Sequence, residues 1–428
     1  MIAKDTIKKE WILFLMILTS SMFVLQVKGM QFFLLLQVLF CVYMFLKTKD
    51  IMLCRFPMIN FIFIELGITV VSALVGNMRF SYKKSAVIMT IMMIPLYFTI
   101  TYLYRKIKED RNVLRLIVKA FKIMCIIQLL WLPLQYVMYH KFGIDINQVI
   151  FVDTLHLLEN ASFVRSYVYY PSGLSWHSAV LAPMFVLGFV FFKNIFVRIL
   201  IVVDVMICGN STSMIGVFIC AVMLFFFWVL YSGKNWKIKR TMLITVVLVA
   251  VFGGIILVAT DSGQTLGNSI VYLWERLFGE GTDASTEAHF GYYMDYFTII
   301  RESSLFQVLF GYGYGCSGYP ITMMYDRYVT LDCWSIECDI INILVSRGII
   351  GFIGYYAFLI YVMIKGWKID YRYFVVMFTI LIQGIGYNIQ WDYVFLMEVL
   401  MLFTIKLGIN FFDNVDIFEK GRLSWLKL

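Results

Sequence analysis

Long runs of hydrophobic residues, separated by short polar segments, fill most of this 428-residue chain. The runs are unbroken rather than alternating, which predicts helices, and most are long enough to cross a bilayer. We expect about twelve membrane-spanning helices, at residues 10–27, 30–46, 57–77, 84–103, 113–139, 175–192, 195–209, 211–231, 241–260, 338–364, 371–389 and 393–411. The least marked boundary is the one between 195–209 and 211–231, where Gly209 and Asn210 form the break.

Two longer polar segments interrupt this pattern. Loops on a rigid scaffold commonly carry binding and catalytic residues, so function is sought there. The predicted order is helices 1–5 (1–139), a first long loop (140–174), helices 6–9 (175–260), a large loop that we expect to be catalytic (261–337), and helices 10–12 with a tail (338–428).

The composition supports a membrane protein. Hydrophobic residues make up 61% of the chain and charged residues 15%. Soluble domains average roughly 45–50% apolar and about 25% charged residues. These values exclude a soluble enzyme, a secreted disulfide scaffold and a disordered chain. We therefore predict an all-α polytopic membrane protein.

The formal charge of +9 predicts topology rather than nucleic-acid binding, because the basic residues lie between the apolar runs. Cytoplasmic segments of membrane proteins are enriched in Lys and Arg. This rule predicts that both termini are cytoplasmic and that the two long loops are extracytoplasmic. The one exception is a basic group on the predicted outer side, at Arg79, Lys83 and Lys84. The basic residues on the predicted inner side include Lys47, Lys49, Arg55, Arg105, Lys106, Lys108, Arg111, Lys193, Arg198, Lys234, Lys237, Lys239, Arg240, Lys365, Lys368 and Arg372.

Several signatures of soluble enzymes are missing from the sequence. It contains no phosphate-binding G-x4-GK[ST] loop, no HExxH and no GxSxG nucleophile motif. The four histidines are too scattered to predict a metal site. We therefore expect a reaction that uses neither a metal nor a cofactor.

Four arginines are candidate ligands for a lipid-linked diphosphate. Arg165 belongs to the first loop, Arg276 and Arg301 belong to the second, and Arg347 lies inside the tenth predicted span. A guanidinium group binds phosphate through two parallel hydrogen bonds and stays charged. Solvated or salt-bridged arginines remain the alternative for each position.

Three alternating glycines follow Arg301, at Gly311, Gly313 and Gly315. This spacing excludes a helix interior and predicts a turn whose backbone amides can approach a ligand closely. A turn without a ligand is the alternative.

Two carboxylates, Glu337 and Asp339, stand at the outer end of the tenth predicted span. A carboxylate there can take the proton of a sugar hydroxyl, whereas a carboxylate that only caps the helix is equally compatible with the sequence. Three cysteines, Cys316, Cys333 and Cys338, share this polar region, and a disulfide among them is left open.

The order of these segments resembles the bacterial O-antigen polymerase and O-antigen ligase superfamily over about residues 160–360. The matching elements are an arginine and aromatic segment at 163–183, a Ser/Thr cluster at 208–216, the glycine element after Arg301, and the SRGIIG segment at 346–351. The resemblance implies a fold similar to C-type glycosyltransferases, a bacterial inner (plasma) membrane location and an extracytoplasmic active site. It also implies undecaprenyl-diphosphate-linked oligosaccharide as the substrate.

Carried over by residue, the resemblance implies that Arg165 and Arg301 hold the diphosphate. Glu337 stands where ligases usually carry a histidine, which favours a polymerase. Two departures from the family pattern are Met214, in place of an arginine beside the Ser/Thr cluster, and a choice of His289 or Arg276 where another arginine is expected.

The function predicted from the sequence is therefore an O-antigen or capsular polysaccharide polymerase. A carboxylate would deprotonate the acceptor hydroxyl, and arginines would stabilise the departing diphosphate. His177, His289 and Trp334 are expected to contact the glycan. The two histidines are the next candidates for the general base if neither carboxylate serves. Aromatic residues in such loops also form interfacial belts, which is the alternative. The alternatives are a ligase that transfers the glycan to lipid A core and a lipid-linked oligosaccharide flippase. The bilayer is an expected partner, and a chain-length regulator is left open.

Overall fold

The computed structural model describes a mostly helical chain, and helices coincide with ten of the twelve predicted apolar runs. The runs at 57–77 and 241–260 fall largely or wholly outside the described residues. The structure describes residues 10–27, 30–49, 67–68, 70–71, 84–159, 161, 164–165, 168–231, 284–313, 317–318, 320, 336–390 and 392–412. Within these ranges the prediction of an all-α protein is confirmed.

The described elements, in chain order, are α2 (Trp11–Thr19), β1 (Gln26–Val27), β2 (Met30–Gln31), α3 (Phe32–Thr48), α5 (Lys84–Glu109), α6 (Asn112–Phe142), the π-helix η1 (Gln148–Thr154), β3 (Val164–Arg165), β4 (Val168–Tyr169), the 3-10 helix η2 (Ser178–Leu181), α7 (Ala182–Phe191), α8 (Ile195–Cys208), α9 (Ser211–Tyr231), α12 (Ala284–Glu302), α13 (Leu305–Phe310), α15 (Asp339–Trp367), α16 (Tyr371–Gly386) and α17 (Asp392–Lys406). The strands form two short antiparallel pairs, β1 with β2 and β3 with β4.

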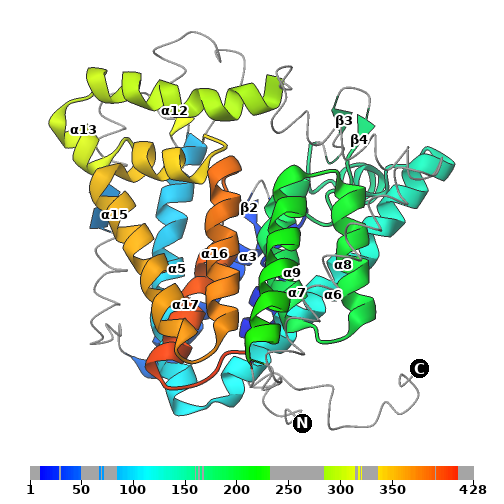
Figure 1. Cartoon of the computed structure of the whole chain (residues 1–428), viewed down its shortest axis with the longest axis horizontal. Coiled ribbons are helices and arrows are strands. Elements are labelled where there is room, and N and C mark those ends of the chain that lie inside the picture. Colours follow the sequence, from blue (N-terminus) through cyan, green and yellow to red (C-terminus); the bar gives the residue numbers. More distant parts are fainter. Residues whose placement is uncertain are drawn as a thin grey trace.

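Most of the long helices run side by side in a bundle (Figure 1). Helices α5, α15, α16 and α17 lie in one half, and α6, α7, α8 and α9 lie in the other. The two halves meet where α16 packs against α9 and α7. Helices α12 and α13 lie across one end of the bundle, above α15 and α16 in this view. One buried apolar core includes side chains from both halves.

The break between α8 and α9 occurs where the sequence predicts it. Gly209 adopts a left-handed backbone with φ 58°, which ends α8. The side chain of Asn210 then accepts a hydrogen bond from the backbone N–H of Ser213, at 2.9 Å, in the first turn of α9. Glycine tolerates this φ and asparagine caps helices well, so two residues suffice to separate two long apolar helices.

The first apolar run is an exception to the predicted pattern. The prediction of one spanning helix over 10–27 is wrong, because α2 ends at Thr19. The hydroxyls of Thr19 and Ser20 bond the carbonyls of Leu15 and Ile17, at 2.9 and 2.8 Å. A helix of nine residues is only about 14 Å long, well short of the roughly 30 Å hydrocarbon core.

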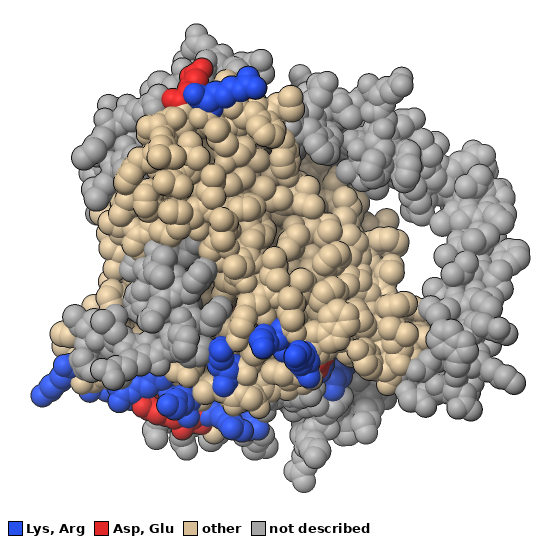
Figure 2. Space-filling model, turned by 60° about the vertical axis from the view of Figure 1, so that its left-hand side comes forward, with Lys and Arg blue, Asp and Glu red and all other residues tan. Residues whose placement is uncertain are grey.

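Two helices in the described part of the chain are long and apolar enough to cross a membrane, α9 and α15. The charged side chains are also unevenly distributed over the surface. Figure 2 shows one face of the molecule on which Lys, Arg, Asp and Glu gather at the two ends, while the described residues of the band between them carry none of these side chains. The number of spanning helices stays a prediction.

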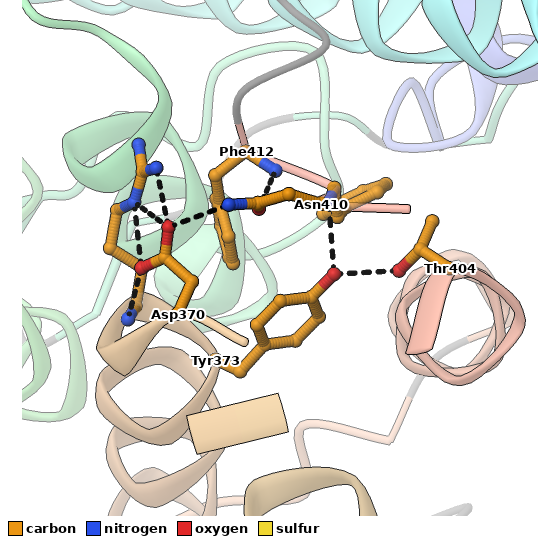
Figure 3. Close-up of polar contacts among 7 residues, drawn as sticks. Asp370, Tyr373, Thr404, Asn410 and Phe412 are labelled. Atoms are coloured by element: carbon orange, nitrogen blue, oxygen red, sulfur yellow. Dashed lines mark hydrogen bonds and ion pairs between the residues drawn. The ribbon is translucent and has the colours of Figure 1, made fainter. Parts of the chain in front are cut away.

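At the end of the bundle opposite α12, a polar network ties the start of α16 to the segment after α17 (Figure 3). The carboxylate of Asp370 accepts hydrogen bonds from Arg372 Nε and from Asn410 Nδ2, each at 3.0 Å. The hydroxyl of Tyr373 accepts one from the backbone N–H of Phe411, at 2.9 Å. These bonds satisfy polar groups at a tightly packed helix junction.

Candidate functional site

The two predicted carboxylates have different surroundings at the start of α15. Asp339 is the first residue of the helix and is only 2% exposed. Its Oδ1 accepts a hydrogen bond from the backbone N–H of Gln390, at 3.4 Å, in the segment between α16 and α17. Gly384 makes room for Asp339, since a Cβ there would lie 3.2 Å from the Asp339 Cβ. Glu337, two residues earlier, is exposed to solvent.

Arg347 lies in the same helix and is 2% exposed. Its charge acts on the carboxyl groups of Asp339, Asp392 and Glu398. Glu398 is fully buried in α17 and accepts a hydrogen bond from the Tyr355 hydroxyl, at 3.3 Å. We name Asp339, Arg347, Asp392 and Glu398 the Arg347 cluster. The guanidinium group lowers the electrostatic cost of these three carboxyl groups from two helices. Asp339, Arg347 and Glu398 are buried and Asp392 is partly buried, and isolated buried charges would be costly.

The glycine element after α13 packs directly against a break in α15. At Gly348 the helix departs from helical geometry, with φ 68° and ψ −175°. The backbone N–H groups of Tyr312 and Gly313 donate to the carbonyls of Val345 and Ser346, at 2.8 and 2.9 Å. A Cβ at Gly311 would lie 2.4 Å from the backbone nitrogen of Arg347.

These contacts give the glycines a structural role. They let the backbone after α13 touch the backbone of α15 without side chains between them. This contact fixes the part of α15 that carries Arg347. The amides of Tyr312 and Gly313 donate to α15 in this arrangement, so a ligand would have to compete for them. Glycan binding by Gly311 and Gly313 stays a prediction, and Gly315 lies outside the described residues.

His177 comes close to Glu337 through an intermediary, Tyr387. The His177 ring stacks on the Tyr387 ring, with centroids 5.5 Å apart and planes 13° from parallel. The Tyr387 hydroxyl lies 3.4 Å from His177 Nδ1, and Tyr387 also interacts electrostatically with Glu337. His177 Nδ1 accepts the backbone N–H of Ala179 at 3.0 Å. In a neutral ring the proton is then on Nε2, which is the nitrogen able to donate a hydrogen bond.

The other predicted site residues are only partly described. Arg301 is exposed in the last turn of α12. Arg165 lies in β3 and His289 in α12, but neither side chain is described. Arg276 and Trp334 lie outside the described residues, as do Cys316 and Cys333. Their proposed roles stay predictions.

Cys338, directly before α15, has a free and buried thiol. Its Sγ donates to the Tyr293 hydroxyl of α12, at 3.1 Å. Within the described ranges no three His, Cys, Asp or Glu side chains are grouped as metal ligands.

Sequence reasoning missed three members of the site, Tyr387, Asp392 and Glu398. Tyr387 lies at the end of the predicted run 371–389, and Asp392 lies in the short break before the run 393–411. Their position at the same end as Glu337 was a usable signal, because consecutive antiparallel spans return the chain to that end. Their individual contacts were not predictable from the sequence.

No protein-family model matches this chain, and no curated protein matches it.

Proposed function

We propose that this chain is a polysaccharide polymerase that transfers a growing glycan from undecaprenyl diphosphate to the next lipid-linked repeat unit. One observation carries the proposal: an exposed carboxylate, Glu337, lies two residues before the buried Asp339 of the Arg347 cluster and interacts electrostatically with Tyr387, on which His177 stacks. This gathers an accessible base, a hydrogen-bond donor and a fixed positive charge at one end of an apolar helical bundle.

The proposal includes about twelve membrane-spanning helices, with this end of the bundle outside the cytoplasm. The uncharged band in Figure 2 and the length of α9 and α15 support a membrane location. The basic turns support the orientation. Lys108 lies in the last turn of α5 and Arg111 just before α6, Lys193 lies between α7 and α8, and Lys368 lies between α15 and α16. These turns lie at the end opposite α12, which would be the cytoplasmic end.

In the proposed reaction, Glu337 takes the proton of the acceptor hydroxyl as that oxygen attacks the anomeric carbon. The bond from this carbon to the diphosphate oxygen breaks, and the diphosphate leaves with the electron pair. Glycosyl transfer has an oxocarbenium-like transition state, so stabilising the leaving group is a large part of catalysis. The exposed Arg301, together with Arg165 and Arg276, is proposed to supply that stabilisation.

Asp339 and Arg347 have a supporting role in this scheme. Both are about 2% exposed, so neither meets a bulky substrate directly. Asp339 binds the backbone at Gln390, within the connection that also carries Tyr387. We infer that the Arg347 cluster positions this connection, and through it the Tyr387 and His177 rings beside Glu337.

A ligase is the second candidate because a histidine does lie at the site. His177 reaches the neighbourhood of Glu337 from another segment, although the position that matches the ligase histidine holds Glu337. The two functions differ in the acceptor. A polymerase extends a lipid-linked repeat unit, whereas a ligase transfers the glycan to a different acceptor such as lipid A core.

The test is polymer formation by purified protein in proteoliposomes supplied with lipid-linked repeat units. Glu337→Gln should lower turnover by about 10²–10⁴-fold without lowering the melting temperature, since an amide cannot accept the proton. Asp339→Asn should lower turnover and stability together. Glu159→Gln is the matched control, because Glu159 is an exposed glutamate with no predicted role.

Wild-type turnover in Glu337→Gln would remove the proposed base. Single transfer to lipid A core without repeat-unit polymer would favour the ligase. Translocation of lipid-linked oligosaccharide without any glycosidic bond formation would favour the flippase and overturn the polymerase.

A further inference from the structure

Helices α12 and α13 expose several large apolar side chains at one end of the bundle. Met294 and Phe297 on α12 are 71% and 59% exposed, and Leu305 and Phe306 on α13 are 75% and 45% exposed. Met294, Phe297 and Arg301 follow a spacing of three and four residues, so they share one face of α12. We call Met294, Phe297, Arg301, Leu305 and Phe306 the α12–α13 face.

The opposite face of α12 is fixed to the bundle. Tyr292, Asp295 and Ile299 are buried there. The Tyr293 hydroxyl donates to the carbonyl of Ile385 at the end of α16, at 3.0 Å. Helix α12 therefore presents its apolar face to the outside in a defined orientation.

Helix α13 is held equally firmly. Ser304 and Gln307 form a reciprocal capping box at its start, in which each side chain bonds the backbone N–H of the other residue. Its other end packs against the break in α15 through Gly311. Leu305 and Phe306 thus project from a short rigid helix rather than from a loose loop.

We propose that the α12–α13 face lies in the headgroup layer of the bilayer, with its apolar side chains against the acyl chains and Arg301 on a lipid phosphate. This inference depends on the proposed membrane location. Helices α12 and α13 lie across the end of α15, which is a candidate span, as an interfacial helix would (Figure 1).

Two further observations favour lipid over a protein partner. Helix α13 packs on α15, whose exposed isoleucines form a stripe that continues down the bundle, at Ile350, Ile353, Ile360 and Ile364. A surface that faces lipid along α15 therefore continues onto α13. Arg301 adds charge complementarity, because an arginine at the edge of an apolar face can extend its guanidinium group to phosphate oxygens.

Anchoring of the α12–α13 face would set the depth of the candidate site relative to the membrane surface. A helix anchored in the headgroup layer holds α13 and the glycine element at the level where a lipid-linked diphosphate lies. The apolar side chains of the proposed face would thus position the large loop relative to the donor without contacting the reacting atoms. Arg301, at the edge of the face, would lie at the level of the lipid phosphates, the donor's diphosphate included.

The test is spin-label accessibility in proteoliposomes of phosphatidylglycerol and phosphatidylcholine. Single cysteines replace Phe297 and Leu305 in a background without the natural cysteines, and labels at Ile353 and Glu159 are the lipid and water references. We expect the Phe297 and Leu305 labels to collide with oxygen more than with a water-soluble nickel reagent, at a ratio severalfold above that at Glu159. Arg301→Gln should shift the Phe297 label toward water.

Water-like accessibility at Phe297 and Leu305, with lipid-like accessibility at Ile353, would overturn this inference and leave the membrane proposal intact. Immobile labels that neither reagent reaches would also overturn it, in favour of a protein partner. Water-like accessibility at Ile353 itself would overturn the membrane proposal and this inference with it.

Discussion

Replacing Gly348 with alanine would insert a methyl group between two backbones. The new Cβ would lie 2.3 Å from the Leu309 carbonyl oxygen and 2.5 Å from the backbone nitrogen of Phe310. The atoms in the way are backbone atoms, which cannot rotate aside as a side chain can. The backbone at Gly348, with φ 68° and ψ −175°, is also one that only glycine adopts readily.

The expected cost combines backbone strain with lost hydrogen bonds. Holding alanine in this conformation costs about 1–3 kcal/mol. If α15 instead becomes regular, α13 must move away and the two bonds from Tyr312 and Gly313 to α15 are lost. Each buried polar group left unsatisfied costs about 1–3 kcal/mol. We therefore expect Gly348→Ala to lower the free energy of unfolding by about 3 kcal/mol or more, and the melting temperature by about 5 °C or more.

The assay is thermal unfolding in detergent, followed by intrinsic tryptophan fluorescence. Gly386→Ala is the matched control, since a Cβ there meets no atom within 4 Å. It should leave the melting temperature unchanged or slightly raised, because alanine favours helix over glycine.

The contact can also be tested from its other side. Gly311→Ala should destabilise similarly, because its Cβ would meet the backbone of Ser346 and Arg347. The double variant should lose little more than either single variant, since both break one contact. A wild-type melting temperature in Gly348→Ala, or fully additive losses, would refute the backbone-contact argument.

The polar network of Figure 3 yields two further predictions. Tyr373→Phe should lower the free energy of unfolding by about 1–3 kcal/mol, because it removes the bond to Thr404 and leaves the buried Phe411 N–H unsatisfied. Chemical denaturation would measure this loss, and an unchanged midpoint would contradict the prediction. Burial raises the pKa of Asp370, but the hydrogen bonds it accepts and the charge of Arg372 outweigh burial and hold the pKa below its usual value. The stabilising contribution of Asp370 is therefore complete above the ordinary pKa of about 3.9 and is lost as the pH falls through the lower pKa of the folded state. The difference in the free energy of unfolding between wild type and Asp370→Asn should accordingly shrink on acidification. A constant difference would count against the assignment.

The sequence by itself determined the helices of the long apolar runs and most of their boundaries, but not α12 and α13, which lie within the segment predicted as the large loop. The apolar runs at 195–209 and 211–231 became α8 and α9, with Gly209 and Asn210 between them. Such boundaries depend on local properties: hydropathy along a few turns, the φ that glycine allows and the cap that asparagine provides. The end of α2 at Thr19 was not predicted, because the hydrophobic run continues past it; the hydroxyls of Thr19 and Ser20 bond backbone carbonyls of the last turn there.

The candidate site was determined from the sequence only in part. Glu337 and Asp339 were recognisable because both adjoin an apolar run, but the sequence could not say that one is exposed and the other buried. Asp339 meets Gln390 across 51 positions, and His177 meets Tyr387 across 210. Only tertiary structure decides such pairs, since they follow from which helix faces pack together. The same holds for Gly311 and Gly348. A Cβ is excluded at each position only because the backbone of the other segment lies against it in the folded chain.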